Sequence, residues 1–141
     1  KVINTEFKKN FKNSKTKLLS EPGRVLVSKS MSLIVRVDLR KKNILYINDG
    51  THSFLHDAGA HDFIYPVKIF NKEEKSKLKP FSFYGPTCDS NDFMRGPFLL
   101  PESINEGDYL QIEEMGAYSL SMKNNFNGFF STPKIFIDEE K

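Results

Sequence analysis

The stretch LIVRVDLRKKNILYINDG, residues 33–50, decides the fold. In its first half, apolar side chains recur at every second position: Leu33, Val35, Val37 and Leu39. This is the period of a β-strand with one buried face. A second strand is predicted over residues 44–48, and Asp49-Gly50 closes it with residues typical of turns. The stretch therefore predicts two neighbouring strands.

Similar short patterns recur on either side of this stretch. Strands are predicted at residues 25–28, 63–70, 81–84, 108–113 and 134–138, with a lysine-rich surface loop at 71–80. Pro66 lies inside one of these strands and predicts an edge or irregular position, because proline cannot donate a ladder hydrogen bond. Strands at this spacing, without a second long helix, predict a mainly β fold: an antiparallel β-barrel or sandwich.

The N-terminal residues have a different pattern. Ile3, Phe7 and Phe11 recur every four residues and predict an amphipathic helix over residues 2–12. A short strand is predicted next, at residues 17–20. A helix followed by a buried strand is typical of α/β domains, and one such unit cannot bury both of its faces alone.

The chain also begins at Lys1 rather than Met. We therefore expect residues 1–24 to be the last helix–strand unit of an absent N-terminal domain. Residues 25–141 are expected to form a C-terminal β-domain.

The composition excludes several classes of protein. A length of 141 residues gives room for one domain with a core, and 13 Phe and 5 Tyr argue against a disordered chain. No apolar run reaches the length of a membrane span or of a signal-peptide core, so no membrane partner is expected. The single cysteine, Cys88, excludes an internal disulfide and a cysteine-rich zinc site. These points favour a cytoplasmic protein.

Charge is unevenly distributed along the chain. Residues 1–42 carry twelve Lys and Arg against three acidic residues, whereas residues 43–141 carry nine against fifteen. A basic arm is a feature of nucleic-acid-binding proteins. Here, however, the basic residues are spread over a predicted helix and two strands, without interleaved aromatic residues on which bases could stack. We therefore expect no nucleic-acid partner.

Four clusters carry the residue types of binding or catalytic sites. They are Glu21-Pro-Gly-Arg24; Gly85-Pro-Thr-Cys-Asp89; Met115-Gly-Ala-Tyr118 with Phe126-Asn-Gly-Phe129; and His52, His56, Asp57, His61 and Asp62. Gly23 allows a close backbone approach to a ligand, and Arg24 suits a phosphate. Cys88 offers a nucleophile or a proton donor. Taken alone, the first cluster is better explained by a strand-to-strand turn and the second by a free cysteine in a loop, and the alternative for the third is a tyrosine packed in the core.

The histidine cluster invites a metal interpretation, because three histidines lie within ten residues. Their spacing matches neither a zinc finger nor a metalloprotease motif. We expect surface histidines in a loop and no metal site.

The order and spacing of these motifs, with Tyr46-Ile-Asn-Asp-Gly50 and Gly107-Asp108 between them, resemble the C-terminal part of the ornithine/diaminopimelate/arginine decarboxylases. The resemblance covers about residues 18–129 and is closest to bacterial ornithine or lysine/ornithine decarboxylases. It implies an alanine-racemase-like fold, in which a (β/α)8 barrel precedes the β-domain. It also implies pyridoxal phosphate as cofactor and a homodimer whose active sites are shared between subunits. The barrel and its cofactor-binding lysine are absent here, so the chain alone is expected to be inactive.

The resemblance assigns four residues to the cofactor. Glu21 matches the acid that faces the pyridine nitrogen and keeps it protonated. Gly23 and Arg24 match the phosphate-binding pair, and Tyr118 matches a second phosphate contact.

Three further residues are assigned to the substrate. Cys88 matches the residue that reprotonates the substrate carbanion, and Phe126 matches an aromatic residue near the substrate. Asp89 matches the residue that meets the distal amine of an amino-acid substrate. Diaminopimelate decarboxylases resemble this loop but carry Glu after the Cys. Asp89 therefore favours a plain distal amine, and so ornithine or lysine.

The resemblance leaves alternatives open. The leading expectation is the conversion of ornithine to putrescine and CO2 in polyamine biosynthesis. A lysine, arginine or diaminopimelate decarboxylase is the next alternative, and a truncated, non-catalytic dimerisation or regulatory module is the alternative from another class. Residues 51–61 depart from the eukaryotic ornithine enzymes, and Asp57 in this segment is a candidate for a second substrate carboxylate.

Overall fold

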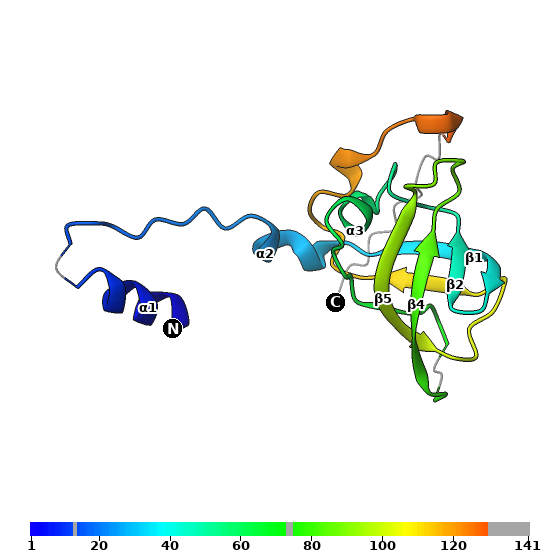
Figure 1. The fold of residues 1–141 in the computed structure, drawn as a ribbon, viewed down its shortest axis with the longest axis horizontal. Coiled ribbons are helices and arrows are strands. Elements are labelled where there is room, and N and C mark those ends of the chain that lie inside the picture. Colours follow the sequence, from blue (N-terminus) through cyan, green and yellow to red (C-terminus); the bar gives the residue numbers. More distant parts are fainter. Residues whose placement is uncertain (13, 73–74, 130–141) are drawn as a thin grey trace, which may run out of the picture.

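The computed structural model describes residues 1–12, 14–72 and 75–129. Its helices are α1 (Val2–Asn10), α2 (Arg24–Val27), α3 (His56–Ala60) and the 3-10 helices η1 (Ser28–Ser30), η2 (Leu120–Met122) and η3 (Phe126–Gly128). Its strands are β1 (Leu33–Lys41), β2 (Ile44–Ile47), β3 (Val67–Ile69), β4 (Leu78–Tyr84), β5 (Phe93–Pro101) and β6 (Tyr109–Ile112). A body of strands forms one end of the molecule, and α1 lies apart from it on an extended segment (Figure 1).

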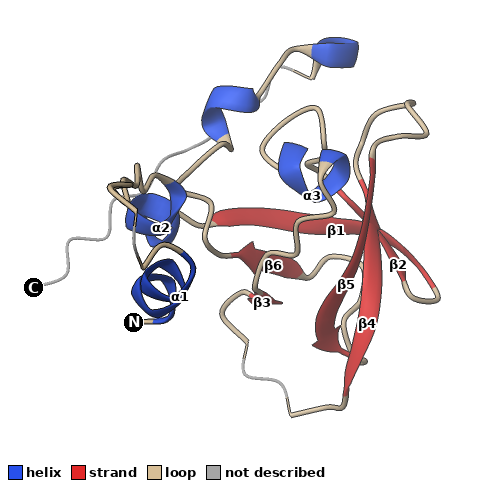
Figure 2. Ribbon diagram, turned by 60° about the vertical axis from the view of Figure 1, so that its left-hand side comes forward, coloured by secondary structure: helices blue, strands red, loops and turns tan. Residues whose placement is uncertain are grey.

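The six strands form one sheet in the order β3-β6-β1-β2-β4-β5. Its neighbours are antiparallel except for β2 and β4, which pair in parallel. The two outer strands, β3 and β5, contact each other, so the sheet curls into a nearly closed barrel (Figure 2). The predicted β-barrel is thus confirmed, with one parallel pair that was not predicted.

The core fills the inside of this barrel. Val35 and Val37 of β1 are buried there, as the alternating pattern predicts. Leu39, the next residue of that pattern, is half exposed, because the register of β1 against β2 shifts between Val37 and Leu39 and turns the side chain outward. On the paired strands β4 and β5, the rings of Phe83 and Phe98 stack with centroids 4.2 Å apart.

Strand β5 was not predicted, because Gly96-Pro97 interrupts its pattern. Phe81 pairs with Phe98 and Phe83 with Met94, so β5 carries extra residues between these two pairs. Gly96 lies in this bulge with a positive φ of 72°, where glycine is favoured. In the sequence, Gly96 and Pro97 indicate the end of a strand. In the structure they lie in an irregularity of one continuous strand.

Two strands predicted near the N-terminus are wrong. Residues 17–20 form no strand, and Leu19 is exposed, because no strand of the described part of the chain accepts their backbone hydrogen bonds. Residues 25–28, rich in valine, form the short helix α2 and the start of η1 instead. Helix α1 agrees with the predicted helix and buries none of its residues.

The other boundaries are close to those predicted. Strand β3 lies at the edge of the sheet directly after Pro66, as the proline predicts, although it is shorter than residues 63–70. Strand β4 begins at Leu78, inside the predicted loop. The strand predicted at residues 134–138 lies outside the described residues. Among the described helices, none combines the length and the hydropathy that a membrane span requires.

Candidate active site

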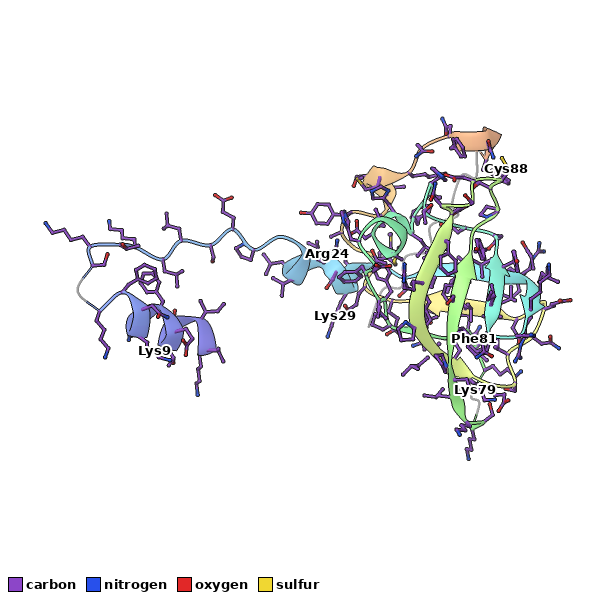
Figure 3. The ribbon with its side chains drawn as sticks, viewed as in Figure 1. Lys9, Arg24, Lys29, Lys79, Phe81 and Cys88 are labelled. Atoms are coloured by element: carbon purple, nitrogen blue, oxygen red, sulfur yellow. The ribbon has the colours of Figure 1, made fainter. Side chains whose placement is uncertain are left out.

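Arg24 forms the centre of the first group of predicted site residues. It begins α2, and its Nη2 donates to the Oδ2 of Asp57 on α3. The guanidinium lies between two aromatic rings, 4.6 Å from the centroid of Phe63 and 5.0 Å from that of Tyr118. An ion pair and two cation–π contacts therefore fix the side chain where α2 meets the barrel, as Figure 3 shows.

The other terminal nitrogen of the Arg24 guanidinium, Nη1, takes no part in this ion pair. Nη1 is buried, and within the described residues it has no hydrogen-bond partner. The hydroxyl of Tyr65 is buried and unpartnered as well. Burial raises the pKa of Tyr65, and the approach of the Arg24 guanidinium to the hydroxyl partly offsets this effect. A buried, unpartnered guanidinium nitrogen is suited to an anionic ligand, because leaving it unpaired costs free energy.

Gly23 and Tyr118 lie beside Arg24. A Cβ added to Gly23 would lie 3.7 Å from the hydroxyl of Tyr118, so backbone and hydroxyl face the same space. Tyr118 is half exposed and has a positive φ of 56°. Three of the four residues predicted for the cofactor are therefore gathered here. The fourth, Glu21, lies exposed in the extended segment that precedes them and makes no hydrogen bond or ion pair with the described residues.

The second group of predicted site residues lies around Cys88, and its loop is held by Asp92, a residue that the sequence analysis does not single out. Its side chain is completely buried. Oδ1 accepts hydrogen bonds from the N–H of Thr51 at 2.7 Å and from its hydroxyl at 3.1 Å, and Oδ2 accepts from the hydroxyl of Thr87 at 2.7 Å and from its N–H at 3.1 Å. Gly50 and Gly85 pack so closely on this carboxylate that a Cβ on either would overlap it. Asp92 thus ties the loop after β2 to the loop that carries Cys88.

Cys88 and Asp89 lie on this loop. The thiol is exposed, and the Nδ2 of Asn127 donates to its Sγ at 3.0 Å. Oδ1 of Asp89 accepts from the N–H and the Nδ2 of Asn91, at 2.9 and 3.1 Å, and Oδ2 lies 2.9 Å from Nε2 of His52. The Asn91 amide first, and His52 second, hold the pKa of Asp89 below its usual value. Asp89 is therefore ionised at neutral pH.

His52 connects Asp89 with the third substrate candidate, Phe126. Its ring stacks on that of Phe126, with centroids 4.2 Å apart and planes at 25°. His52 and Asp89, together with residues of α3 and β5, line a cleft of about 480 Å³. Two of the three residues predicted for the substrate, Asp89 and Phe126, are thus joined by a histidine that the sequence suggested only as part of a loop, and Cys88 precedes Asp89 in the chain.

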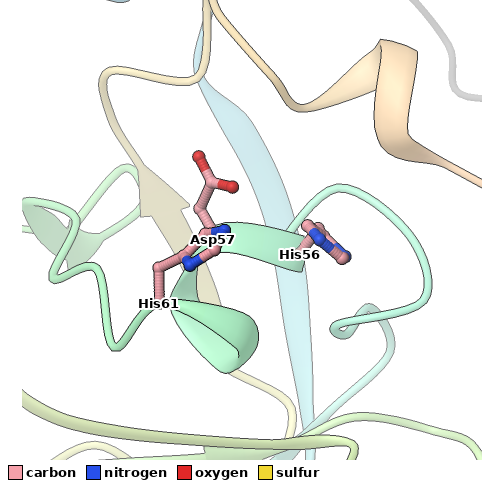
Figure 4. A group of neighbouring side chains, drawn as sticks. All are labelled: His56, Asp57 and His61. Carbon is pink, nitrogen blue, oxygen red and sulfur yellow. The ribbon is translucent and has the colours of Figure 1, made fainter.

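The remaining histidines form a cluster of a different kind. His56, Asp57 and His61 bring one ligand atom each within 4.8 Å of one another (Figure 4). The carboxylate of Asp57 is already paired with the guanidinium of Arg24, however. A second cation would be repelled by that positive charge. Asp57 therefore belongs with the Arg24 group rather than with the residues at Asp89.

Comparisons with known proteins identify the family. Residues 24–116 match the model of the pyridoxal-dependent decarboxylase C-terminal sheet domain. The chain belongs to this family. Pyridoxal phosphate is the cofactor of the family, and the buried Nη1 of Arg24, beside Gly23 and Tyr118, fits its phosphate group.

The curated relatives include several kinds of protein. Ornithine decarboxylase of Schizosaccharomyces pombe is 31% identical over 88% of this chain and 32% of its own length. Antizyme inhibitor 2 of Xenopus laevis is 33% identical over 94% and 33%, and diaminopimelate decarboxylase of Helicobacter pylori is 31% identical over 84% and 29%. The chain thus spans about a third of the length of these relatives.

Solved structures of decarboxylases have the same fold. The structure of SrLDC in complex with PLP and cadaverine has a TM-score of 0.68 and 28% identity, covering 95% of this chain and 35% of the other. Lysine/ornithine decarboxylase of Vibrio vulnificus with cadaverine has a TM-score of 0.67 and 28% identity, covering 86% and 34%.

Proposed function

We propose that this chain is the C-terminal domain of a pyridoxal-phosphate-dependent decarboxylase for an α-amino acid with a distal primary amine, with ornithine as the preferred substrate and putrescine and CO2 as products. Asp89 carries the proposal. It is an ionised carboxylate directly after Cys88, and it faces a cleft. A carboxylate so placed binds an ammonium group through a charge-assisted hydrogen bond.

The shape of the acidic side chain supports a diamine-forming substrate. Asp89 is anchored by Asn91 in its own loop, so its carboxylate has little freedom to move toward other ligands. The family resemblance associates a longer Glu at this position with diaminopimelate, whose distal end carries a carboxylate as well as an amine. Ornithine and lysine both fit Asp89. We favour ornithine, with lysine and arginine as alternatives.

The cofactor would be held by the Arg24 group. Arg24 Nη1 and the Tyr118 hydroxyl would donate to the phosphate, and Gly23 would allow the backbone to approach it. We assign the carboxylate of Glu21 to the ring nitrogen of the cofactor. Bound pyridoxal phosphate supplies the electron sink that makes loss of CO2 from the α-carbon possible.

We assign to Cys88 the role of donating the proton that replaces the lost CO2. Its thiol is exposed and is oriented by Asn127. The thiol S–H would donate its proton to the α-carbon, and the amide of Asn127 would support the negative charge left on sulfur. Asp89, one residue later, would hold the distal end of the substrate so that the α-carbon meets this thiol.

A complete site is proposed to need two chains. Among the described residues, no hydrogen bond, ion pair or ring contact joins the Arg24 group to the Cys88 group, and Arg24 and Cys88 lie apart in the view of Figure 3. In a homodimer, the Cys88 group of one subunit would complete the site built around Arg24 of the other. The barrel proposed to precede residue 25, of which residues 1–24 would be the last unit, would supply the rest.

The test is decarboxylation by a reassembled enzyme. We would combine this chain with the barrel segment of an ornithine decarboxylase relative and measure CO2 released from carboxyl-labelled ornithine, lysine, arginine and diaminopimelate. We expect no activity from the chain alone, and ornithine as the best substrate of the assembly. Asp89→Asn should lower kcat/KM for ornithine by about 10- to 100-fold, the effect of one charge-assisted hydrogen bond.

Asp38→Asn is the matched control, because Asp38 is an exposed carboxylate paired with Arg36 on β1. It should leave kcat/KM unchanged. Full activity of the Cys88→Ala assembly would contradict the role assigned to Cys88. A preference for diaminopimelate would contradict the role assigned to Asp89.

A non-catalytic module is the second candidate. It is favoured by one observation: a relative covering 94% of the chain is named antizyme inhibitor 2 and not a decarboxylase. An assembly that binds pyridoxal phosphate but releases no CO2 from any of the four amino acids would support this candidate. The DNA upstream of the codon for Lys1 would separate the two cases independently, since an in-frame barrel with its cofactor lysine indicates an enzyme.

A further inference from the structure

His52 holds the carboxylate on which substrate recognition is proposed to depend. Oδ1 of Asp89 is anchored within its own loop, because it accepts two hydrogen bonds from Asn91. Oδ2 has one partner in the described residues, Nε2 of His52 at 2.9 Å. The loop fixes one oxygen of the carboxylate, and His52 therefore determines where the other one points.

The lone pairs of the carboxylate locate the free acceptor position. A carboxylate offers about four lone-pair sites, two on each oxygen. Asn91 occupies both sites on Oδ1 and His52 one on Oδ2. The remaining site is on Oδ2, the oxygen that His52 positions. An ammonium group that binds Asp89 in this arrangement therefore binds next to the imidazole.

The same imidazole also holds the aromatic residue of the site. Its ring stacks on Phe126 at 4.2 Å, and the carbonyl of His52 accepts a hydrogen bond from the N–H of Asn124 at 3.2 Å. The side chain of Asn124 in turn accepts from the N–H of Phe126 at 2.9 Å. The segment 124–126 is thus attached to His52 by its backbone and by its ring.

The backbone next to His52 is anchored by hydrogen bonds to a buried carboxylate. The residue before it, Thr51, is bound to the buried carboxylate of Asp92 through both N–H and hydroxyl. The side chains of His52 and Asp89 are only 28% and 24% exposed, so their hydrogen bond is partly shielded from water. Partial burial strengthens such a contact relative to a pair on the open surface.

We propose that His52 is the positioning residue of the site for the distal amine: one imidazole orients the carboxylate of Asp89 and supports the ring of Phe126, and so fixes the position of each relative to the other. This inference rests on the proposed function. Nε2–H donates to Oδ2 in the neutral imidazole, which leaves the negative charge of Asp89 available to an ammonium ion. His52 does not touch the α-carbon, and its effect is confined to the distal end of the substrate.

The first arm of the test uses the 141-residue chain itself. The carboxyl carbon of Asp89 is titrated by NMR in the wild type, in His52→Phe, which keeps a stacking ring without the donor, and in His52→Gln, which keeps a donor without the ring. We expect the pKa of Asp89 to rise toward its ordinary value in His52→Phe and to stay low in His52→Gln. His61→Phe is the matched control, because His61 is an exposed histidine at the end of α3, and it should leave the pKa unchanged. An unchanged pKa in His52→Phe would overturn the proposal.

The second arm uses the assembly with the barrel segment. His52→Phe should raise KM for ornithine about tenfold and leave kcat within about twofold, since a hydrogen bond to a charged group corresponds to roughly this factor. Two inhibitors that differ only in the distal amine, 1,4-diaminobutane and butylamine, separate positioning from general damage. Inhibition by the diamine should weaken in His52→Phe and recover in His52→Gln, whereas inhibition by butylamine should not change.

The possible failures are distinguishable. Equal weakening for both inhibitors, or a KM equal to that of the wild type, would overturn the role of His52 while leaving the decarboxylase proposal intact. A wild-type assembly that decarboxylates none of the amino acids would overturn the proposed function, and the substrate role of His52 with it.

Discussion

Gly116 lies directly against the carbonyl oxygen of Val27, so closely that a Cβ on residue 116 would overlap this oxygen. The N–H of Gly116 also donates to the carbonyl of Ser28 at 2.9 Å. These contacts attach the loop that carries Tyr118 to the end of the helix that carries Arg24. Gly116 therefore sets the position of one phosphate-binding candidate relative to the other without contacting a ligand itself.

Gly116→Ala should separate these two elements. The added methyl group forces either α2 or the loop 115–119 to shift, and overpacking of this kind costs about 1–3 kcal/mol. We expect a lower midpoint of urea unfolding in the chain, and weaker binding of pyridoxal phosphate in the assembly. Gly107→Ala is an informative comparison, because a Cβ at residue 107 meets no atom within 4 Å and its cost comes from the positive φ of Gly107, which Gly116 does not have. Binding of the cofactor equal to the wild type in Gly116→Ala would contradict this role.

Asp92 is expected to be the most sensitive polar residue of the barrel. Asp92→Asn replaces one oxygen by an NH2 group, which cannot accept from both donors of Thr51 or both donors of Thr87. We expect a loss of about 2–4 kcal/mol in the free energy of unfolding, measured in urea, because buried donors are left unpaired. Asp38→Asn, on the surface, should cost less than about 0.5 kcal/mol. A loss of that smaller size for Asp92→Asn would refute the structural role.

The extent to which the sequence predicts this molecule depends on how far apart the interacting residues lie. Alternation in residues 33–38 predicts β1, because it reports one strand on one face of a sheet. The same pattern fails at Leu39, where the partner strand shifts register, and at Val25-Leu26-Val27, which pair with no strand among residues 1–12, 14–72 and 75–129. Propensity for a strand does not produce one without a neighbour.

The site residues follow the same rule. Motif spacing was enough to select Arg24 and Cys88 and to recognise the family. Asp92 and His52 act on residues about forty positions away, and a single sequence carries no signal for such pairs. Asp57 is a candidate from the sequence for a second carboxylate that contacts the substrate, and only the structure reveals that it pairs with Arg24.

Asp49 should make stability depend on pH in an unusual direction. Burial raises its pKa to about 6, although the hydrogen bond from the Phe54 amide opposes this shift. In the unfolded chain the pKa is about 4, so between pH 4 and 6 the folded state binds the extra proton. The stabilisation is present below about pH 4 and is lost as the pH rises through 6, a loss of about 3 kcal/mol for a shift of this size.

Asp49→Asn isolates this contribution, since Asp89 and Glu102, whose pKa values are lowered, act in the opposite direction in both proteins. The amide oxygen can still accept from Phe54. We expect the difference in unfolding free energy between variant and wild type to grow in favour of the variant from pH 4 to pH 7. A difference that does not change with pH would show that Asp49 ionises normally.

Tyr65→Phe is expected to stabilise the chain slightly. The ring of Tyr65 is buried against Phe63, with centroids 4.7 Å apart, and its hydroxyl has no hydrogen-bond partner in the described residues. Removing a buried, unpartnered hydroxyl recovers its desolvation cost, about 1 kcal/mol. Tyr109→Phe on the exposed face of β6 should be neutral. A loss of stability in Tyr65→Phe would mean that the hydroxyl has a partner, and Arg24 would be the first residue to examine.

The proposal that two subunits share each active site has a quantitative test in the assembly with the barrel. Arg24→Ala removes the phosphate group's partner and Cys88→Ala removes the proton donor, so each variant alone should have little activity. If the two residues act in the same site from different subunits, a mixed dimer contains one site with both defects and one with neither. Random exchange of equal amounts makes half of the dimers mixed, so activity should return to about a quarter of the wild type. If both residues act from the same subunit, no site is restored by mixing, and activity stays at the level of the single variants.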